Sequence, residues 1–397
     1  MPGFELFGDQ ERKEVNDVLE SGVLMRYGFD GMRNGHWKAK ELENALKDEL
    51  KVNHAQLVSS GTAAVSVAMA IAGVGAGDEV IMPTFTFVAS FEAIMMLGAI
   101  PVLVDIDDTL TLDPKAVEAA ITKKTKAVMP VHMCGSMANL DALHAICDQH
   151  DLLLIEDACQ AIGGTYKGKP LGSYGDVGCF SFDFVKTMTC GEGGAIITNN
   201  EDYFKNADHF SDHGHDHVGN DRGAESHPFL GYNFRISELN AAVGLAQVRR
   251  LKEFLAIQKK HYQILRAALE PIEAVTFRTV PEGGEESYAF LNFFLPDLET
   301  ARRVNDAFKT NGVDACFHYF DNNWHYIRKW DHLVNLNSLY PISPAVKEGL
   351  AYLKETKFEQ SDHYIGRNLS CLIKMSWSEE QVHQRGQLMA DIIKSCL

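Results

Sequence analysis

Short apolar runs alternate with runs of helical spacing between about residues 57 and 200. The runs at 63–74 and 90–99 predict helices, and strand-like runs lie at 78–83, 100–107, 125–132, 152–158, 176–182 and 193–199. Strands that alternate with helices are typical of an α/β domain around a mostly parallel sheet. Because ligands bind at the carboxyl ends of such strands, we expect the functional residues where these runs end.

The second half of the chain begins with a long helical pattern. The run at 235–271 has helical spacing, and Ser237 is a plausible N-cap residue for it. A strand-like run at 288–296 and further helical runs follow. Since 397 residues exceed what one compact core usually supports, we predict two domains. These are a large domain with the N-terminal segment at 1–255 and a smaller C-terminal α+β domain at 256–397.

The charge balance limits the classes of partner. The chain has a formal net charge of −17, whereas a protein that binds nucleic acid needs a basic face. An anionic small molecule needs only a few local cations and is not excluded. The N-terminal residues show no basic region followed by an apolar one, and glycines interrupt the longest apolar run, 62–77. We expect a cytoplasmic protein with no signal peptide, membrane partner or nucleic-acid partner.

The cysteines give no sign of a disulfide framework. No C-x-x-C pair occurs among the eight, and most lie inside apolar runs. We expect buried free thiols in a reducing compartment rather than disulfides or a zinc site. The eight cysteines are Cys134, Cys147, Cys159, Cys179, Cys190, Cys316, Cys371 and Cys396.

A small polar turn precedes the helical run at 63–74. The turn reads Ser59-Ser60-Gly61-Thr62, and the free amides and positive dipole end of a helix that begins there form an anion site suited to a phosphate. A capped helix after a tight turn is the simpler interpretation of this stretch alone. The sequence is neither a Walker loop nor a dinucleotide-binding turn, since both need glycines or a lysine at other spacings.

An acidic pair and a lysine follow along the same domain. Glu156 and Asp157 end a strand-like run, where a buried carboxylate needs a cation or a donor. Asp157 is either a helix cap or the partner of a cationic ring nitrogen, as in pyridoxal phosphate enzymes. Lys186 lies in the partly apolar stretch "FDFVKTMTCGEGGA". A partly desolvated lysine amine can condense with an aldehyde, although most lysines are simply solvated.

Six motifs occur in a characteristic order between residues 59 and 246. They read "SSGTAA", "PTFTFVAS", "PVLVDID", "EDACQAIGG", "FSFDFVKTMTCGEGGAIITN" and "GYNFRISELNAA". As a set they resemble the DegT/DnrJ/EryC1/StrS family of sugar aminotransferases. This resemblance implies the pyridoxal phosphate-dependent transferase fold type I, with a mostly parallel seven-stranded sheet between helices.

The resemblance also implies roles for single residues. Lys186 would hold the cofactor covalently and move the proton during catalysis, Asp157 would pair with the ring nitrogen, and Gln160 would contact the ring hydroxyl. Phe87 would stack on the ring. A further implied set binds the phosphate of the cofactor: Ser60, Gly61, Thr62 and Ser181. Asn233 would reach the cofactor phosphate of the neighbouring subunit, which implies a homodimer with shared active sites.

Several stretches depart from the usual family pattern. Asp183 and Phe184 replace a His-Pro pair, and Cys190 replaces a threonine. The segments 21–43, 316–330 and 369–381 also differ, and we expect the substrate side of the site there. They resemble a narrower subgroup that forms the 8-amino derivative of the sugar acid Kdo. The acceptor would be 8-oxo-3,8-dideoxy-manno-octulosonate and the donor L-glutamate. A nucleotide-linked keto-deoxy hexose is the alternative acceptor.

A sugar acid requires a cation for its carboxylate. Arg26, Arg33 and Lys38 in the unusual N-terminal segment are candidates, and Arg235 is another. For each of them a solvated charge is the alternative interpretation.

Histidines form a second group of candidates. His209, His213, His215 and His217 lie close together, and we interpret the tract as a polar loop over the active site rather than a metal site. His213 and His215 are candidates for contact with substrate or a neighbouring subunit. His132 is interpreted as a residue in or behind the cofactor pocket, because Lys186 already supplies the base.

Two other functions fit the sequence less well. A pyridoxal phosphate-dependent sugar dehydratase is less consistent, because family members that eliminate water often lack the lysine that is present here as Lys186. A non-catalytic regulator would leave Lys186, Asp157 and Gln160 unexplained. We therefore favour an aminotransferase in which the same lysine serves both half-reactions, which predicts ping-pong kinetics.

Overall fold

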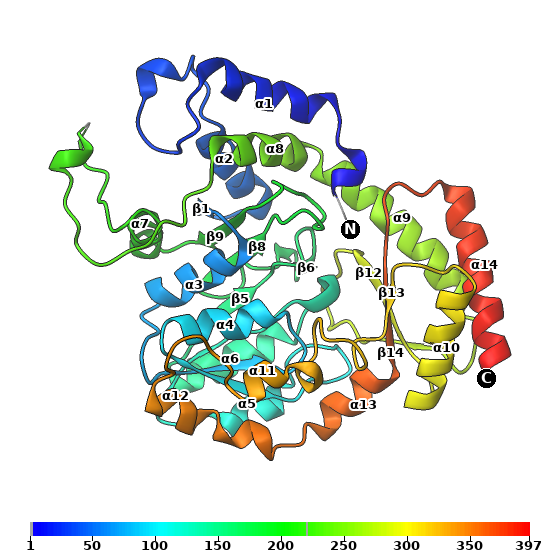
Figure 1. Ribbon diagram of the computed structural model, residues 1–397. Helices are drawn as coiled ribbons and strands as arrows, with labels where there is room; N and C mark the ends of the chain where they lie inside the picture. The colour runs from blue at the N-terminus through cyan, green and yellow to red at the C-terminus, as the bar shows by residue number, and fades with distance from the viewer. Residues whose placement is uncertain (1–2, 220) are drawn as a thin grey trace.

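A seven-stranded sheet forms the centre of the larger part of the molecule (Figure 1). The computed structural model describes residues 3–219 and 221–397. Strand β9 runs antiparallel to both neighbours, and the other pairs in this sheet are parallel. This arrangement confirms the predicted α/β fold. In spatial order the strands are β1 (His54–Val58), β9 (Gly194–Thr198), β8 (Val177–Ser181), β5 (Leu153–Asp157), β4 (Thr125–Val128), β2 (Glu79–Pro83) and β3 (Ile100–Val104).

Helices cover both faces of this sheet, because successive strand residues are apolar on both sides. Leu57 and Val58 of β1, for example, are both fully buried but belong to different apolar clusters. In the described part of the chain, no helix has the length and apolarity needed to cross a membrane. The helices of this part are α1 (Asp9–Ser21), α2 (Lys38–Leu50), α3 (Gly61–Ile71), α4 (Val88–Met96), α5 (Pro114–Ala120), α6 (Leu140–His150), α7 (Glu201–Phe210) and α8 (Glu238–Arg249).

The predicted continuous helix at 235–271 is wrong in one respect. Ser237 does cap its start, since its hydroxyl accepts a hydrogen bond from the Asn240 amide. The helix is interrupted at Arg250, whose backbone (φ −103°, ψ 0°) lies outside the helical range, and α9 (Leu251–Leu269) continues in a new direction (Figure 1). The guanidinium group of Arg250 donates to the Leu6 carbonyl at 2.7 Å, so contact with the N-terminal segment accompanies the break.

A second, antiparallel sheet of four short strands lies beside the first and packs against α9 and two further helices. Its order is β10 (Thr276–Phe277), β12 (Phe290–Phe294), β14 (Asn368–Leu372) and β13 (Cys316–Phe317), with α10 (Leu298–Thr310) and α14 (Glu379–Cys396) over it. Three very short strands form a third sheet: β11 (Gly284–Glu285), β6 (Thr165–Tyr166) and β7 (Lys169–Pro170).

Part of the C-terminal sequence packs back onto the larger sheet. Trp330, Leu333 and Val346 belong to the same apolar cluster as Val58 and the residues of α3 and α4. These side chains come from α11 (Asp331–Val334), α12 (Pro344–Gly349) and the loop before them, which precede α13 (Glu359–Arg367). The C-terminal sequence therefore forms the four-stranded sheet and also contributes side chains that pack against the large sheet. The division into domains at residue 255 stays a prediction.

The expectation that all cysteines are free is wrong for two of them. Cys316 and Cys371 form a disulfide, because they face each other across the antiparallel strands β13 and β14. Such partners are close in space although 55 residues separate them in sequence, which no spacing rule reveals. The other six cysteines are free thiols, and Cys134, Cys147, Cys179 and Cys190 are buried as expected.

Candidate active site

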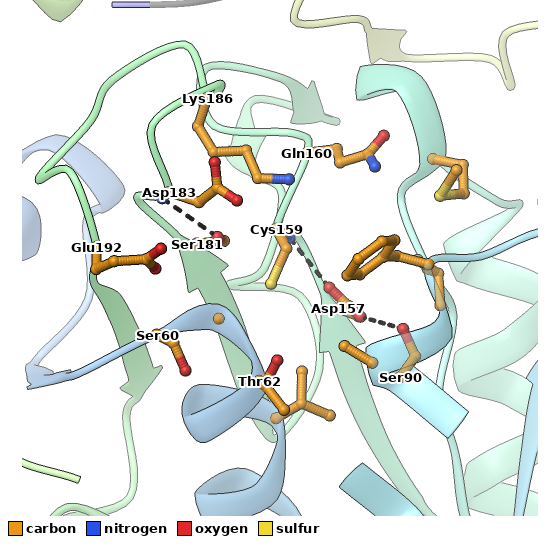
Figure 2. Close-up of a pocket in the computed structure, with 16 residues that line it drawn as sticks. Ser60, Thr62, Ser90, Asp157, Cys159, Gln160, Ser181, Asp183, Lys186 and Glu192 are labelled. Atoms are coloured by element: carbon orange, nitrogen blue, oxygen red, sulfur yellow. Dashed lines mark hydrogen bonds between the residues drawn. The ribbon is translucent and has the colours of Figure 1, made fainter. Parts of the chain in front are cut away.

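A cavity of about 110 Å³ lies where β1, β5 and β8 end and where α3 and α4 begin (Figure 2). The carboxyl ends of parallel strands and the amino ends of helices meet at this edge of the sheet, which is the usual ligand position in such folds. The structure brings together eight residues that the sequence singled out for the cofactor: Ser60, Gly61, Thr62, Phe87, Asp157, Gln160, Ser181 and Lys186.

Asp157 lines the cavity at the end of β5. Its side chain accepts hydrogen bonds from the Ser90 hydroxyl at 2.8 Å and from the Cys159 amide at 3.1 Å. The residue is only 4% exposed, and no cationic side chain within the described residues forms an ion pair with it. A buried carboxylate with neutral donors alone can still receive a cation. This arrangement fits a cationic ring nitrogen.

Lys186 lies on the loop between β8 and β9. Figure 2 shows its side chain extending across the cavity toward Gln160. The loop is fixed through the backbone, because the Lys186 amide donates to the Asp183 carbonyl at 3.0 Å and its carbonyl accepts from the Gly3 amide at 2.8 Å. No carboxylate in the described ranges pairs with its ammonium group. The amine is therefore positioned without being neutralised by a salt bridge, as a reacting amine requires.

The amino end of α3 provides an anion site beside Lys186. The Ser60 hydroxyl caps the helix by accepting from the Ala63 amide at 3.0 Å. The amides of Gly61 and Thr62 donate to no acceptor in the part of the chain that the structure describes. Free amides at the positive end of a helix bind phosphate well, and the Ser181 hydroxyl lies against the same turn. The turn therefore fits the cofactor phosphate.

A substitution of Gly61 by alanine tests this turn. A Cβ atom there would lie 2.6 Å from the Ser181 Cβ and 2.9 Å from its hydroxyl oxygen. We expect a loss of about 1–3 kcal/mol of unfolding free energy and weaker retention of the cofactor. Denaturant titration and equilibrium dialysis measure the two effects. Gly75→Ala is the control, because a Cβ atom there meets open space. Equal stability of the two variants would contradict the close approach.

Gln160 and Phe87 complete the predicted set. The Gln160 side-chain carbonyl accepts from the Cys134 amide at 3.0 Å, which leaves its NH2 group available to a ligand. Phe87 lies just before α4 and is 47% exposed, as expected for a ring that stacks on a bound cofactor. Both placements agree with the roles that the family resemblance implies.

Several residues of the site were missed by the sequence analysis. Ser90, Cys159, Asp183 and Glu192 also line the cavity, and burial together with Asp183 raises the pKa of Glu192. All four lie inside motifs that the sequence analysis quoted, which was the available signal: Ser90 in "PTFTFVAS", Cys159 in "EDACQAIGG", and Asp183 and Glu192 in "FSFDFVKTMTCGEGGAIITN".

His325 was also missed, and it lies beside Phe87. The ring centroids of the two residues are 5.5 Å apart, and the His325 backbone carbonyl accepts from the Thr86 amide at 2.9 Å. Burial, followed by the nearby charge of Lys186, lowers the pKa of His325 to about 3. The imidazole is therefore neutral, and its Nδ1 atom has no hydrogen-bond partner within residues 3–219 and 221–397.

Two residues that were predicted to lie near a cofactor are not among those that line this cavity. His132 is fully buried behind it, 2.8 Å from the carboxylate of Glu156. Glu156 also accepts three backbone amides from the loop at 172–175, so this pair fixes a loop rather than facing a ligand. Asn233 is exposed, and its backbone forms a bridge to Asp212. Its contact with a neighbouring subunit stays a prediction.

The four candidate cations for substrate all have carboxylate partners within the chain. Arg26 lies 2.5 Å from Glu43, and Arg33 lies 3.3 Å from Glu238. The other two pairings are Lys38 with Glu14 and Asp17, and Arg235 with Asp212. Carboxylates of the same chain therefore neutralise most of the charge of these cations. The sequence could not show these pairings.

The histidine tract is held mainly by acidic neighbours. His217 lies between Asp208 (2.7 Å) and Asp212 (2.8 Å), and His215 lies 2.8 Å from Glu225. His213 is exposed, and the Nδ1 atom of His209 is buried and has no hydrogen-bond partner among the residues that the structure describes. Over residues 3–219 and 221–397, no cluster of histidine, cysteine and acidic side chains could hold a metal ion.

The charge of His217 predicts a pH dependence of stability. Burial opposes the charge, but hydrogen bonds to Asp208 and Asp212 outweigh it and raise the pKa from 6.5 to about 9. The stabilisation is fully present below pH 6.5 and is lost as the pH rises through about 9. Asparagine tolerates the left-handed backbone of this residue, φ 52°. We expect His217→Asn to flatten the decline in unfolding free energy over this range by about 2–3 kcal/mol.

Urea denaturation at pH 6.5 and 9 measures this difference in slope. His144→Asn is the control, since His144 is an exposed helical residue whose partner Asp148 is also exposed. Parallel pH profiles of the wild type and His217→Asn would contradict the assignment.

Comparison with known proteins agrees with this geometry. A model of the DegT/DnrJ/EryC1/StrS aminotransferase family matches residues 6–355. The 3-amino-5-hydroxybenzoate synthase of Amycolatopsis mediterranei (strain S699) is 36% identical over 308 residues, which are 76% of each chain. The GDP-perosamine synthase of Vibrio cholerae is 38% identical over 260 residues, 65% of this chain and 68% of the relative.

Solved structures show the same similarity over nearly the whole chain. The crystal structure of 3-amino-5-hydroxybenzoic acid synthase has a TM-score of 0.82 at 29% identity and covers 98% of this chain and 97% of its own. The aminotransferase from Psychrobacter cryohalolentis has a TM-score of 0.84 at 26% identity and covers 98% of both chains. The chain is therefore a pyridoxal phosphate-dependent aminotransferase that belongs to the DegT/DnrJ/EryC1/StrS family.

Proposed function

We propose that this aminotransferase moves the amino group of L-glutamate to the 8-oxo carbon of 3,8-dideoxy-manno-octulosonate, which gives the 8-amino sugar acid for lipopolysaccharide. The observation that carries the proposal is the position of the segments that depart from the family pattern. Segment 316–330 contributes His325, which contacts Phe87 at the cavity. Segment 21–43 lines a larger second cavity. Two of the three unusual segments therefore lie beside the first cavity or line the second, which supports a different acceptor, whereas segment 369–381 includes most of β14 and lines neither cavity.

Different residues of the chain are proposed to have different functions in the reaction. Bound pyridoxal phosphate supplies an aldehyde and an electron-withdrawing ring. The Lys186 amine would hold the aldehyde and would move the proton to and from the reacting carbon. Asp157 would keep the ring nitrogen protonated, and the amides of Gly61 and Thr62 would hold the phosphate. Phe87 would stack on the ring, and Gln160 would contact its hydroxyl group.

We also propose that the protein is cytoplasmic and forms a homodimer in which the two subunits share their active sites. Exposed apolar side chains surround the loops at the site, although such patches are rarely left in water. Phe184 is 52% exposed and Val185 49% exposed beside Lys186, while Leu230 is 91% exposed and Tyr232 51% exposed beside Asn233. A second subunit over these loops would bury them and bring Asn233 to the partner's cofactor.

A nucleotide-linked keto-deoxy hexose is the second candidate acceptor. The similarity to a protein named GDP-perosamine synthase supports it. The dehydratase alternative is weaker because Lys186 is present in the cavity.

Separate half-reactions test the proposed function. The holoenzyme is first titrated with L-glutamate, which is expected to convert the visible cofactor band to that of the aminated cofactor with release of 2-oxoglutarate. After glutamate is removed, the 8-oxo octulosonate is expected to restore the original band and yield the 8-amino product by mass spectrometry. A nucleotide-linked keto-deoxy hexose is the matched comparison. Restoration by the hexose alone would overturn the choice of acceptor, and no response to glutamate would overturn the choice of donor.

A further inference from the structure

A second cavity of about 600 Å³ lies between the N-terminal segment, β1 and the end of α7. In Figure 1 the N-terminal segment and the loop after α7 project on the same side of the molecule. The volume falls in the range of small-molecule sites. Its walls carry aromatic rings, among them Tyr27, Phe29, Trp37 and Phe204. Such rings pack well against the apolar faces of a sugar.

Two cationic side chains in this cavity retain unused hydrogen-bond donors. Arg26 is 5% exposed, and its Nη2 atom contacts both Glu43 (2.5 Å) and Gln56 (3.1 Å). Its Nε and Nη1 atoms are buried and have no partner in the described residues. Buried donors without partners are costly unless a ligand or water fills the site. Arg26 therefore indicates an acceptor group that is bound in this cavity.

Lys40 is the second cation, and the sequence analysis did not single it out. Its ammonium group stands 3.3 Å from the centre of the Trp37 ring, and no carboxylate in the described residues forms an ion pair with it. Burial and the neighbouring charge of Arg26 hold the pKa of Lys40 below its ordinary value, although Asp30 opposes them. A bound anion would relieve this repulsion.

The charge of the cavity favours a single carboxylate over a pyrophosphate. The remaining cations on the wall are already paired, because Arg222 contacts Asp212 at 2.9 Å and His217 lies between Asp208 and Asp212. The ammonium group of Lys40 and the free donors of Arg26 therefore remain, and Asp30 is the carboxylate on this wall that forms no ion pair within the described residues. A group with two or more negative charges would meet an otherwise neutralised wall.

We propose that this cavity binds the carboxylate end of a sugar acid, with Lys40 and Arg26 as its cationic partners. The inference rests on the proposed function, since it assigns the site that recognises the acceptor. Asp212, which anchors Arg222 on the cavity wall, also forms the backbone bridge to Asn233. The cavity therefore adjoins the segment that we propose to face the partner's cofactor.

Calorimetric titration of the holoenzyme with 3-deoxy-manno-octulosonate tests the proposal. This sugar acid has a hydroxyl group in place of the reacting oxo group, so it binds without turnover. We expect Lys40→Gln to weaken its binding by about ten-fold or more, as for the loss of a charged hydrogen-bond partner. The carboxamide of the same sugar is expected to bind the wild type more weakly by a similar factor. Lys47→Gln, on the same helix but outside the cavity, is the control.

Steady-state kinetics distinguish substrate binding from a purely structural role, because a structural role of Lys40 would not change the KM for the acceptor selectively. Lys40→Gln is expected to raise the KM for the oxo sugar acid by about ten-fold and to change kcat much less. Equal affinity of the wild type and Lys40→Gln for the octulosonate would overturn the proposal. Binding of a nucleoside diphosphate that depends on Lys40, without binding of the octulosonate, would overturn the choice of a carboxylate. The response of the wild type to glutamate alone checks the proposed function separately.

Discussion

Lys186→Ala is expected to lower kcat by about 10⁴-fold or more, because the substitution removes two functions at once. The amine that binds the cofactor aldehyde is lost, and so is the group that moves the proton on the reacting carbon. The geometry offers no replacement, since the other described side chains that line the cavity include no second lysine. Steady-state kinetics with glutamate and the acceptor measure the loss.

The spectrum of the bound cofactor separates chemistry from folding. Lys186→Ala is expected to retain the cofactor through the amides of α3 and the stacking ring of Phe87, but glutamate should no longer convert it at a measurable rate. Lys205→Ala is the control, since this exposed lysine pairs with Glu201 at 2.8 Å on α7. Retention of more than about 1% of kcat in Lys186→Ala would contradict the nucleophilic and proton-transfer roles.

The central sheet could be predicted because its strands are buried on both faces and read as unbroken apolar runs. Helical spacing, in contrast, did not predict the break at Arg250, where the side chain donates a hydrogen bond to the Leu6 carbonyl. A tertiary contact between residues so far apart leaves no trace in helical periodicity. The Cys316–Cys371 disulfide was missed for the same reason, since strand register brings the two residues together.

Most residues predicted for the cofactor lie together in one cavity, whereas those predicted for the substrate do not. Asp157 and Ser181 are the last residues of β5 and β8, and Gly61 follows β1. Parallel strands bring their carboxyl ends to one edge of the sheet. The candidate cations come from loops and helix ends, where the sequence does not show which carboxylate will be near. Arg33 is thus paired with Glu238, far along the chain. Lys40 was overlooked although it is the cation in its cavity that lacks an ion-pair partner among the described residues.

Asp157→Asn is expected to lower kcat by about 10²- to 10³-fold, the cost of removing one partner of a buried ion pair. A neutral amide cannot stabilise the protonated ring nitrogen, so the ring becomes a weaker electron sink. The amide has nearly the same shape as the carboxylate and can still bond to the Ser90 hydroxyl and the Cys159 amide, which now contact Asp157 at 2.8 and 3.1 Å. Kinetics of the glutamate half-reaction measure the effect.

Ser90→Ala is the matched control, because it removes the hydroxyl bound to Asp157 but leaves the carboxylate in place. We expect at most about a ten-fold loss of kcat, the usual scale of one hydrogen bond to a charged group. Thermal denaturation of both variants shows whether folding is affected. If Ser90→Ala lowers kcat as much as Asp157→Asn, the hydrogen bond from the Ser90 hydroxyl, rather than the negative charge of Asp157, determines the activity of the cofactor ring. If Asp157→Asn alone is impaired at unchanged stability, the charge itself acts on the cofactor.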